Sequence, residues 1–211
     1  MDLKKLKKEQ LELSKKVLIK DEIKKISTIA GCDQAFFDHK IVSAIVVMDY
    51  ESMKPIESKY AILDVAMPYI PGFLSYREAP AIVEAFSRLS KKPDVLLVDG
   101  NGILHPRRIG IASHIGLLLD VPTIGIAKKL LIGDVEDDNV IVDKEIRAKV
   151  LSTKKGSKPI YVSPGHKVSM RTSIQIVKHA LNETFKLPLP LHEAHKLANK
   201  IRKRKRSDSE A

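Results

Sequence analysis

The sequence predicts one α/β domain built on a mixed central sheet that is flanked by helices. Three strand-like runs stand together between residues 26 and 65. After residue 74, helical segments alternate with apolar strand-like runs, as in sheets that contain parallel strands. With 211 residues, 44% of them hydrophobic, the chain is long enough to bury one large core. No repeat or linker divides it, so we expect a single domain over residues 1–200.

The first part of the chain predicts a helix followed by an antiparallel meander. Leucine and valine recur at near-helical spacing among lysines, which predicts an amphipathic helix over residues 3–20. Strands are expected at 26–36, 41–48 and 59–65, because short polar segments separate these β-like runs. The following segment, Pro68-Tyr69-Ile70-Pro71-Gly72, cannot continue a strand ladder, since its two prolines lack donors.

The second part of the chain predicts helices and buried strands in alternation. A helix over 74–90 ends before Pro93. The run at 94–99 is almost entirely apolar, as expected of a strand buried on both faces. The remaining expected elements are a helix over 107–119, a strand at 123–127, a hairpin of 147–152 with 159–163, and helices near 169–185 and 190–203.

Positive charge is concentrated at the two ends of the sequence. The formal net charge is +11, from 37 Lys and Arg against 26 Asp and Glu. Residues 1–25 contribute +4 and residues 196–211 contribute +5, which leaves +2 for residues 26–195. Basic ends favour polyanions such as nucleic acid. For residues 201–211 a flexible, solvated basic tail is an equally good interpretation.

The composition also limits the class of protein. Cys32 is the single cysteine, which excludes an internal disulfide framework and a cysteine-based zinc cluster. No apolar stretch approaches about 20 residues, and the lysine-rich amino terminus has no apolar signal-peptide core. We therefore expect a cytoplasmic protein with no membrane partner.

Three carboxylates stand out by their context. Asp33 lies inside the first strand, Asp99 ends the most apolar strand, and Glu78 lies one turn into a helix. Burying an unpaired carboxylate is costly, so such groups have a partner or a metal. Each could pair with an arginine such as Arg77 or Arg107. Gathered at one point, they would suit Mg²⁺ or Mn²⁺ and could support phosphodiester cleavage.

Five segments together closely resemble the endonuclease V family of metal-dependent nucleases, which act on inosine-containing nucleic acid. The resemblance covers residues 5–200 and implies a ribonuclease-H-like fold, whose mixed sheet begins with an antiparallel three-strand meander. The segments are AGCD at 30–33, PYIPGFLSYRE at 68–78, DGNGILHPRR through GIAK at 99–128, PIYVSPGH at 159–166, and the helix that carries Ala194-His195.

The resemblance implies a catalytic set of five side chains. Asp33, Glu78 and Asp99 match the family's metal-binding acids, and His195 matches a histidine that joins them. Lys128 matches a lysine near the scissile phosphate, where a cation offsets developing negative charge. The cofactor implied is Mg²⁺, with Mn²⁺ able to replace it.

The resemblance also implies residues that bind nucleic acid. The Pro68-Tyr69-Ile70-Pro71 segment matches a wedge that enters the duplex at the lesion, where Tyr69 can stack in place of the removed base. Without the resemblance, a rigid core turn with Tyr69 half buried is the better interpretation. The flipped base enters a pocket near Gly72, Leu74, Gly100, Asn101, Gly102, Gly110 and Ile111, and His105 and Arg107 support phosphates or the active site.

The function implied is that of a DNA-repair endonuclease that acts as a monomer. It recognises inosine, which is deaminated adenine, and hydrolyses the second phosphodiester bond 3′ to the lesion, leaving 3′-hydroxyl and 5′-phosphate ends. One alternative is another ribonuclease-H-like nuclease that acts on inosine-containing RNA. A second alternative is a noncatalytic nucleic-acid-binding module that retains the fold.

Overall fold

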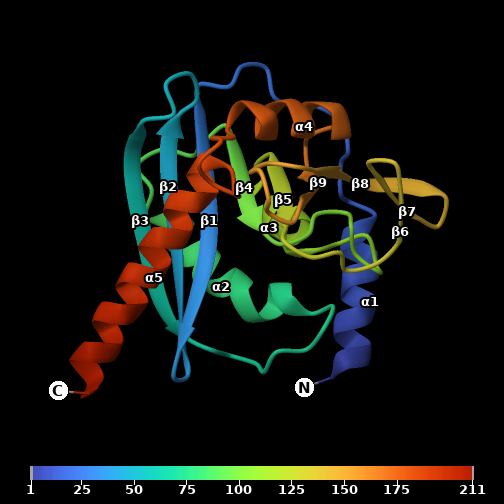
Figure 1. The fold of residues 1–211 in the computed structure, drawn as a ribbon. Coiled ribbons are helices and arrows are strands. Elements are labelled where there is room, and N and C mark those ends of the chain that lie inside the picture. Colours follow the sequence, from blue (N-terminus) through green and yellow to red (C-terminus); the bar gives the residue numbers. More distant parts are fainter. Residues whose placement is uncertain (1, 211) are drawn as a thin grey trace.

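A nine-stranded mixed sheet forms the centre of the computed structural model, which describes residues 2–210 (Figure 1). The strand order across the sheet is β3-β2-β1-β4-β5-β9-β8-β7-β6. The strands are β1 (Thr28–Phe37), β2 (Lys40–Asp49), β3 (Pro55–Asp64), β4 (Val95–Asp99), β5 (Thr123–Ala127), β6 (Asp134–Glu136), β7 (Asn139–Val142), β8 (Glu145–Leu151) and β9 (Ile160–His166).

The pairing of the strands confirms the predicted mixed sheet. β1, β2 and β3 pair antiparallel as a meander. β4 runs parallel to both β1 and β5, and β9 then runs antiparallel to β5. The α/β fold class predicted from the sequence is therefore confirmed, including the order in which the meander and the parallel strands follow one another.

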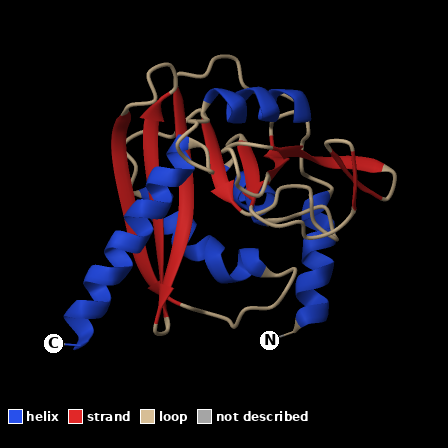
Figure 2. Cartoon of the chain, in the orientation of Figure 1, coloured by secondary structure: helices blue, strands red, loops and turns tan. Residues whose placement is uncertain are grey.

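Helices cover both faces of the sheet and make three layers (Figure 2). α4 and α5 pack on one face through a core cluster that includes Ile29, Leu97 and Leu191. α2 and α3 pack on the other face through a second core cluster, in which Ile82 of α2 lies with Leu96 of β4. The helices are α1 (Leu3–Ser14), α2 (Leu74–Ser87), α3 (Ile111–Leu119), α4 (Met170–His179) and α5 (Leu189–Glu210).

Two helix boundaries differ from the sequence prediction because of tertiary contacts. α1 ends at Ser14 rather than at residue 20, because the next residues pack onto the domain: Val17 is buried in a small cluster, and the backbone of Leu18 bonds His166 and Lys167. α3 begins at Ile111 rather than at residue 107. Arg108 has a φ of 57°, which no right-handed helix accepts.

The elements after β5 show further differences. β6 and β7 form a hairpin that the sequence analysis did not predict, since β6 is exposed throughout and carries no apolar alternation. α4 ends at His179, not at residue 185, and a loop joins it to α5. α5 continues to Glu210, so most of the segment expected as a flexible tail is helical. The division into a domain of residues 1–200 and a tail stays a prediction.

No helix among residues 2–210 is both long and apolar enough to span a membrane.

Candidate functional site

Three carboxylates from distant parts of the chain meet where the pairing of β1 and β4 ends. The last paired positions are Cys32 and Val98, so Asp33 and Asp99 occupy the next position on each strand. Glu78 lies one turn into α2, and the three side chains line one depression of the surface. Beyond this point β1 pairs with β2 alone, which leaves this edge of β1 open. The structure thus brings together the acids that the sequence analysis singled out.

Burial and mutual repulsion raise the pKa values of two carboxyl groups in this acidic depression. Burial, together with repulsion from Asp99 and Asp33, raises the pKa of Glu78 to about 8, and Arg77 offsets only part of this effect. Burial and the nearby Asp33 also raise the pKa of Asp99. Lys128 lies beside the acids and donates a hydrogen bond to Oδ2 of Asp99 at 2.5 Å. A bound cation would relieve the repulsion that remains.

His195 belongs to α5, and its side chain lies next to one of the acids. Its Nδ1 lies 2.6 Å from Oδ2 of Asp33, and its side chain is 46% exposed. The approach of α5 depends on Gly31, because a Cβ there would collide with the backbone of Pro190 and Leu191. The start of α5 therefore packs directly on the backbone of β1, two residues before Asp33. This contact positions His195 beside Asp33.

The donor set fits a hard divalent cation. Carboxylate oxygens are the ligands that Mg²⁺ and Mn²⁺ prefer, and an imidazole is acceptable to Mn²⁺. In this arrangement Lys128 and His195 each engage one carboxylate oxygen. Within the described part of the chain, no group of three or more His, Cys, Asp or Glu side chains is already arranged to hold a metal ion. Lys128 and His195 would therefore have to release oxygens for the cation.

Replacing Glu78 with glutamine is expected to stabilise the metal-free protein. The pKa of Glu78 is about 8 in the fold and 4.5 in the unfolded chain, so its charge costs stability increasingly as the pH rises from about 4.5 to about 8. At pH 8 or above, Glu78→Gln should raise Tm by at least about 2–4 °C, the shift that 1 kcal/mol produces in a chain of this size. Thermal melting with and without Mg²⁺ measures this.

A matched control for this prediction lies on the same helix. Glu84 is a more exposed acid of α2 that pairs with Arg88, and Glu84→Gln should leave Tm within about 1–2 °C of the wild type, since surface pairs contribute little. Mg²⁺ should raise the Tm of the wild type more than that of Glu78→Gln. An unchanged or lower Tm of metal-free Glu78→Gln would contradict the argument.

A small cavity adjoins the acidic depression and shares Leu74 and Gly100 with it. Its volume is about 130 Å³, which is below the roughly 300–1,000 Å³ of sites for drug-sized ligands. The cavity is therefore large enough for one small ring system, such as a nucleic-acid base, and we call it the base-sized cavity. Of the residues predicted to bind nucleic acid, those that line this base-sized cavity are Tyr69, Pro71, Gly72, Leu74, Gly100, His105 and Gly110, with Asn101 and Ile111 beside them.

Four of the predicted nucleic-acid-binding residues do not line the cavity. Pro68 and Ile70 belong to the loop before it. Gly102 is buried, and a Cβ at that position would collide with the carbonyl of Pro164, so this glycine allows the loop to pack against β9. The side chain of Arg107 donates a hydrogen bond to the carbonyl oxygen of Gly72.

Asn101 lines this cavity and carries a buried acceptor that is not paired within the described part of the chain. Its Oδ1 is buried and has no hydrogen-bond partner among the described residues. Leaving a buried polar atom unpaired costs about 1–3 kcal/mol, so such an atom in a cavity indicates a position where a ligand donor can bind. The sequence analysis placed Asn101 near the pocket but gave it no role, since pattern alone does not show which loop atoms lack partners.

The Pro68-Tyr69-Ile70-Pro71 segment presents Tyr69 to solvent at the edge of the cavity. The Tyr69 side chain is 66% exposed, so the interpretation of a half-buried tyrosine in a core turn is wrong. Both ends of the loop are anchored. Arg77 donates to the carbonyl of Met67 at 2.8 Å, and several donors hold Gly72. An exposed aromatic ring on a fixed loop can enter another molecule with little loss of its own entropy.

Three donors converge on the carbonyl oxygen of Gly72. Arg107 donates at 2.5 Å, Gln10 at 3.1 Å and the Nε2 of His105 lies at 3.2 Å. The Nδ1 of His105 accepts from the backbone of Arg107, and burial lowers the pKa of His105 to about 4, so the ring is neutral and Nε2 carries the proton. Both His105 and Arg107 thus support the loop through Gly72, and a contact of either with a phosphate stays a prediction.

Gln10 is a site residue that the sequence analysis missed. It is 1% exposed and joins α1 to both Gly72 and Arg107. Its role was not recognisable from the sequence, because the leucine spacing of the amino-terminal helix indicates only the apolar face. Gln10 is one of many polar residues in that helix. α1 is therefore a support of the exposed loop as well as a basic arm.

Gln10→Ala is expected to loosen the loop without unfolding the domain. The change removes a donor to Gly72 and an acceptor of Arg107, at a cost of about 1–2 kcal/mol. Hydrogen exchange of residues 67–73 should become faster, while β4 and β5 stay protected. As a control, changing the exposed Gln175 of α4 to alanine should not change this exchange. Unchanged protection of 67–73 in Gln10→Ala would show that Arg107 and His105 suffice.

Comparisons with known proteins show which sequences and folds this chain is similar to. The sequence model of the family described as Endonuclease V matches residues 11–196. Endonuclease V of Dictyoglomus thermophilum is 42% identical over 194 residues, which are 88% of this chain and 85% of that protein. The crystal structure of Endonuclease V from Bacillus subtilis superimposes with a TM-score of 0.90 at 30% identity, covering 99% of this chain and 95% of that one.

A further structure was solved with nucleic acid. Endonuclease V of Ciona intestinalis, in complex with DNA containing an inosine followed by a ribo-adenosine, superimposes with a TM-score of 0.87 at 29% identity. The superposition covers 97% of this chain and 99% of that one.

Proposed function

The chain belongs to the endonuclease V family of nucleases, and from this premise we propose that it is an inosine-directed, Mg²⁺-dependent DNA-repair endonuclease. It would hydrolyse the second phosphodiester bond 3′ to the lesion and leave 3′-hydroxyl and 5′-phosphate ends. The observation that carries the proposal is the junction of the base-sized cavity with the acidic depression through Leu74 and Gly100. One strand can place a base in the first and its backbone at the second.

The base-sized cavity supports recognition of inosine. Hypoxanthine carries a proton on N1, whereas the N1 of adenine is an acceptor. The unpaired Oδ1 of Asn101 could accept that proton, and adenine would leave it unpaired. Sites that hydrogen-bond a substrate group discriminate strongly against analogues that lack it, because buried partners are then left unsatisfied. Extruding a base costs least where it is poorly paired, which also favours inosine over a normal pair.

The acidic depression supports hydrolysis of a phosphodiester. Asp33, Glu78 and Asp99 would hold the cation, with His195 completing the set from α5. The divalent ion, when bound, supplies Lewis acidity and an activated water. Lys128 would turn from Asp99 toward the scissile phosphate, where its ammonium group offsets charge that develops in the transition state.

Cleavage of defined oligonucleotides tests the proposed function. A duplex with one deoxyinosine should be cut at the second phosphodiester 3′ to it in Mg²⁺, while the same duplex with deoxyadenosine and the reaction in EDTA should stay intact. Labelling both ends identifies the position and the 5′-phosphate. The same panel in RNA strands distinguishes the alternative of an RNA-directed nuclease. An intact inosine strand in both Mg²⁺ and Mn²⁺ would overturn the proposal.

A further inference from the structure

A third depression, the basic groove, lies beyond Lys128 on the side of the acidic depression away from the base-sized cavity. Its volume is about 620 Å³, and no acidic side chain lines it. Lys128 forms the border that it shares with the acidic depression. The other charged or titratable side chains that line it are Lys154, Lys155, Lys186, His192 and His195.

The lysines of the basic groove stand on two loops that are tied together. The backbone N–H and the hydroxyl of Ser157 both donate to the carbonyl of Lys154, which closes a turn at the tip of the β8–β9 connection. The hydroxyl of Thr153 donates to the carbonyl of Lys186 at 2.7 Å. The loop of Lys186 is in turn held to α5, because Phe185 stacks on His192 with ring centroids 3.8 Å apart.

Three lysines of the basic groove are not paired with acids in the described part of the protein. Lys154, Lys155 and Lys186 form no ion pair with an acid among residues 2–210, whereas some other surface lysines do. Lys149 pairs with Asp138, and Lys167 pairs with Asp120. Gathering like charges without acids is unfavourable, so such a cluster indicates a surface that meets an anion.

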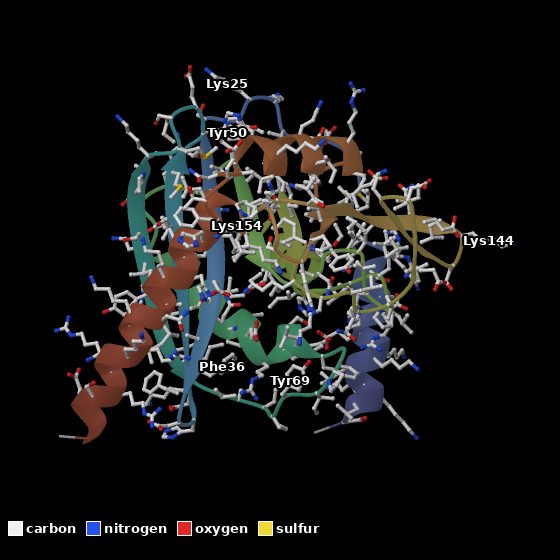
Figure 3. All side chains as sticks on the ribbon, in the orientation of Figure 1. Lys25, Phe36, Tyr50, Tyr69, Lys144 and Lys154 are labelled. Carbon is white, nitrogen blue, oxygen red and sulfur yellow. The ribbon has the colours of Figure 1, made fainter. Side chains whose placement is uncertain are left out.

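The order of the three depressions defines a path for one strand. The base-sized cavity shares Leu74 and Gly100 with the acidic depression, and the acidic depression shares Lys128 with the basic groove. In the view of Figure 3, Tyr69 and Lys154 lie on opposite sides of α2. A strand that places a base in the cavity and a phosphate at the acids can therefore continue into the basic groove.

We propose that the basic groove binds the backbone phosphates of the substrate strand on the 3′ side of the scissile bond. This inference rests on the proposed function, which puts cleavage 3′ to the inosine. Lysine ammonium groups are point charges that tolerate many phosphate geometries, so the groove would bind backbone of any sequence. It would hold the 5′-phosphate strand while the acidic depression acts on the bond.

The test compares two variants that each lose three positive charges. The groove variant is Lys154→Ala with Lys155→Ala and Lys186→Ala. The control variant is Lys54→Ala with Lys91→Ala and Lys92→Ala, since these lysines lie before β3 and β4, at the end of the sheet where β1 and β4 begin, and they form no ion pair within the described residues. Circular dichroism and melting check that both fold. A Lys154→Glu, Lys155→Glu variant serves as a second groove change.

Two inosine duplexes are used for cleavage and for binding. One extends ten base pairs 3′ of the scissile bond, and the other ends one nucleotide beyond it. Cleavage is measured as kcat/KM. Binding is measured by fluorescence anisotropy against salt, with every variant also carrying Asp99→Ala so that the strand stays intact.

The groove variant should lose about 10- to 100-fold in affinity and kcat/KM on the long duplex but less than about 3-fold on the short one. Its salt slope on the long duplex should fall by about 2–3, as expected for the loss of that many phosphate contacts. The control variant should match the unmodified protein on both duplexes. Equal losses on the long and short duplexes, or an equal loss in the control, would overturn the inference.

Failure of the proposed function is distinguishable from failure of the inference. If the unmodified protein cuts neither inosine duplex, the proposed function is wrong. Anisotropy on an inosine-free duplex still decides whether the groove binds phosphates. If it does, the dependence of the binding constant on salt concentration becomes weaker in the groove variant and does not change in the control variant. An unchanged slope overturns the inference.

Discussion

Asp99→Ala is expected to lower the rate of cleavage of inosine-containing DNA by at least about 1,000-fold. Asp99 ends β4 in the centre of the acidic depression, next to Asp33 and in contact with Lys128. Losing it would remove a proposed ligand of the cation and the hydrogen-bond acceptor of Lys128. Since a catalytic cation contributes several kcal/mol to the transition state and each 1.36 kcal/mol is tenfold in rate, a loss of this size follows. Single-turnover cleavage in saturating Mg²⁺ measures it.

The fold should survive this change, which separates chemistry from stability. Removing one acid relieves repulsion on Asp33 and Glu78, while it costs the ion pair with Lys128. Asp99→Asn keeps the shape and an acceptor for Lys128, and it should be as inactive as the alanine variant. Asp134→Ala, an exposed acid of β6, is the matched control and should cleave normally. Cleavage within tenfold of the wild type by both Asp99 variants would place the catalytic site elsewhere.

Tyr69→Ala is expected to lower kcat/KM on duplex DNA by about 10- to 100-fold. The exposed ring stands at the mouth of the base-sized cavity on a loop anchored through Met67 and Gly72. Stacking of an aromatic ring on a base is worth about 1–3 kcal/mol, and this energy offsets the unstacking of the extruded base. On single-stranded substrate the base needs no extrusion from a duplex, so the loss there should stay below about 3-fold.

Tyr60→Ala is the matched control for the Tyr69 change. Tyr60 is also an exposed tyrosine, with 42% of its surface accessible, but it lies on β3 and lines neither the cavity nor the acidic depression. Both variants should melt within about 2 °C of the wild type. An equal loss on single-stranded and duplex substrates in Tyr69→Ala would show that Tyr69 binds the base and does not act in its extrusion.

Much of the fold follows from local pattern. The antiparallel meander was predictable because β1 and β2 are β-rich runs joined by a short polar turn, and β4 because a continuous apolar run indicates burial on both faces. The boundaries that failed depend on contacts distant in sequence. α1 ends where Val17 packs into the domain. α3 starts late because Arg108 takes a positive φ in a loop whose Gly110 N–H donates to the carbonyl of Gly102.

The β6–β7 hairpin was missed for a related reason. Its first strand is fully exposed, so no apolar alternation marks it, and the acidic residues of this segment are typical of a loop. Pairing with the edge of β8 through β7 orders it instead. The extension of α5 over residues expected as a flexible tail shows the same limit, because charge pattern alone does not separate a helix from a solvated coil.

The sequence by itself determined which residue types were available for chemistry. Asp33, Glu78 and Asp99 were recognisable because carboxylates in or beside apolar runs are costly to bury without a purpose, and the motifs around them indicated the family. Their assembly depended on the tertiary structure, because only the end of the β1–β4 pairing and the placement of α2 bring the acids to one depression.

The tertiary structure alone decided the supporting parts of the site. It buried Gln10 against Gly72, left Oδ1 of Asn101 without a partner, and tied the loops of Lys154 and Lys186 together beyond Lys128. The physical reason is that the pattern of polar and apolar residues in one helix or strand indicates only which of its side chains face solvent. Hydrogen bonds and fields between elements depend on distances that no local pattern contains.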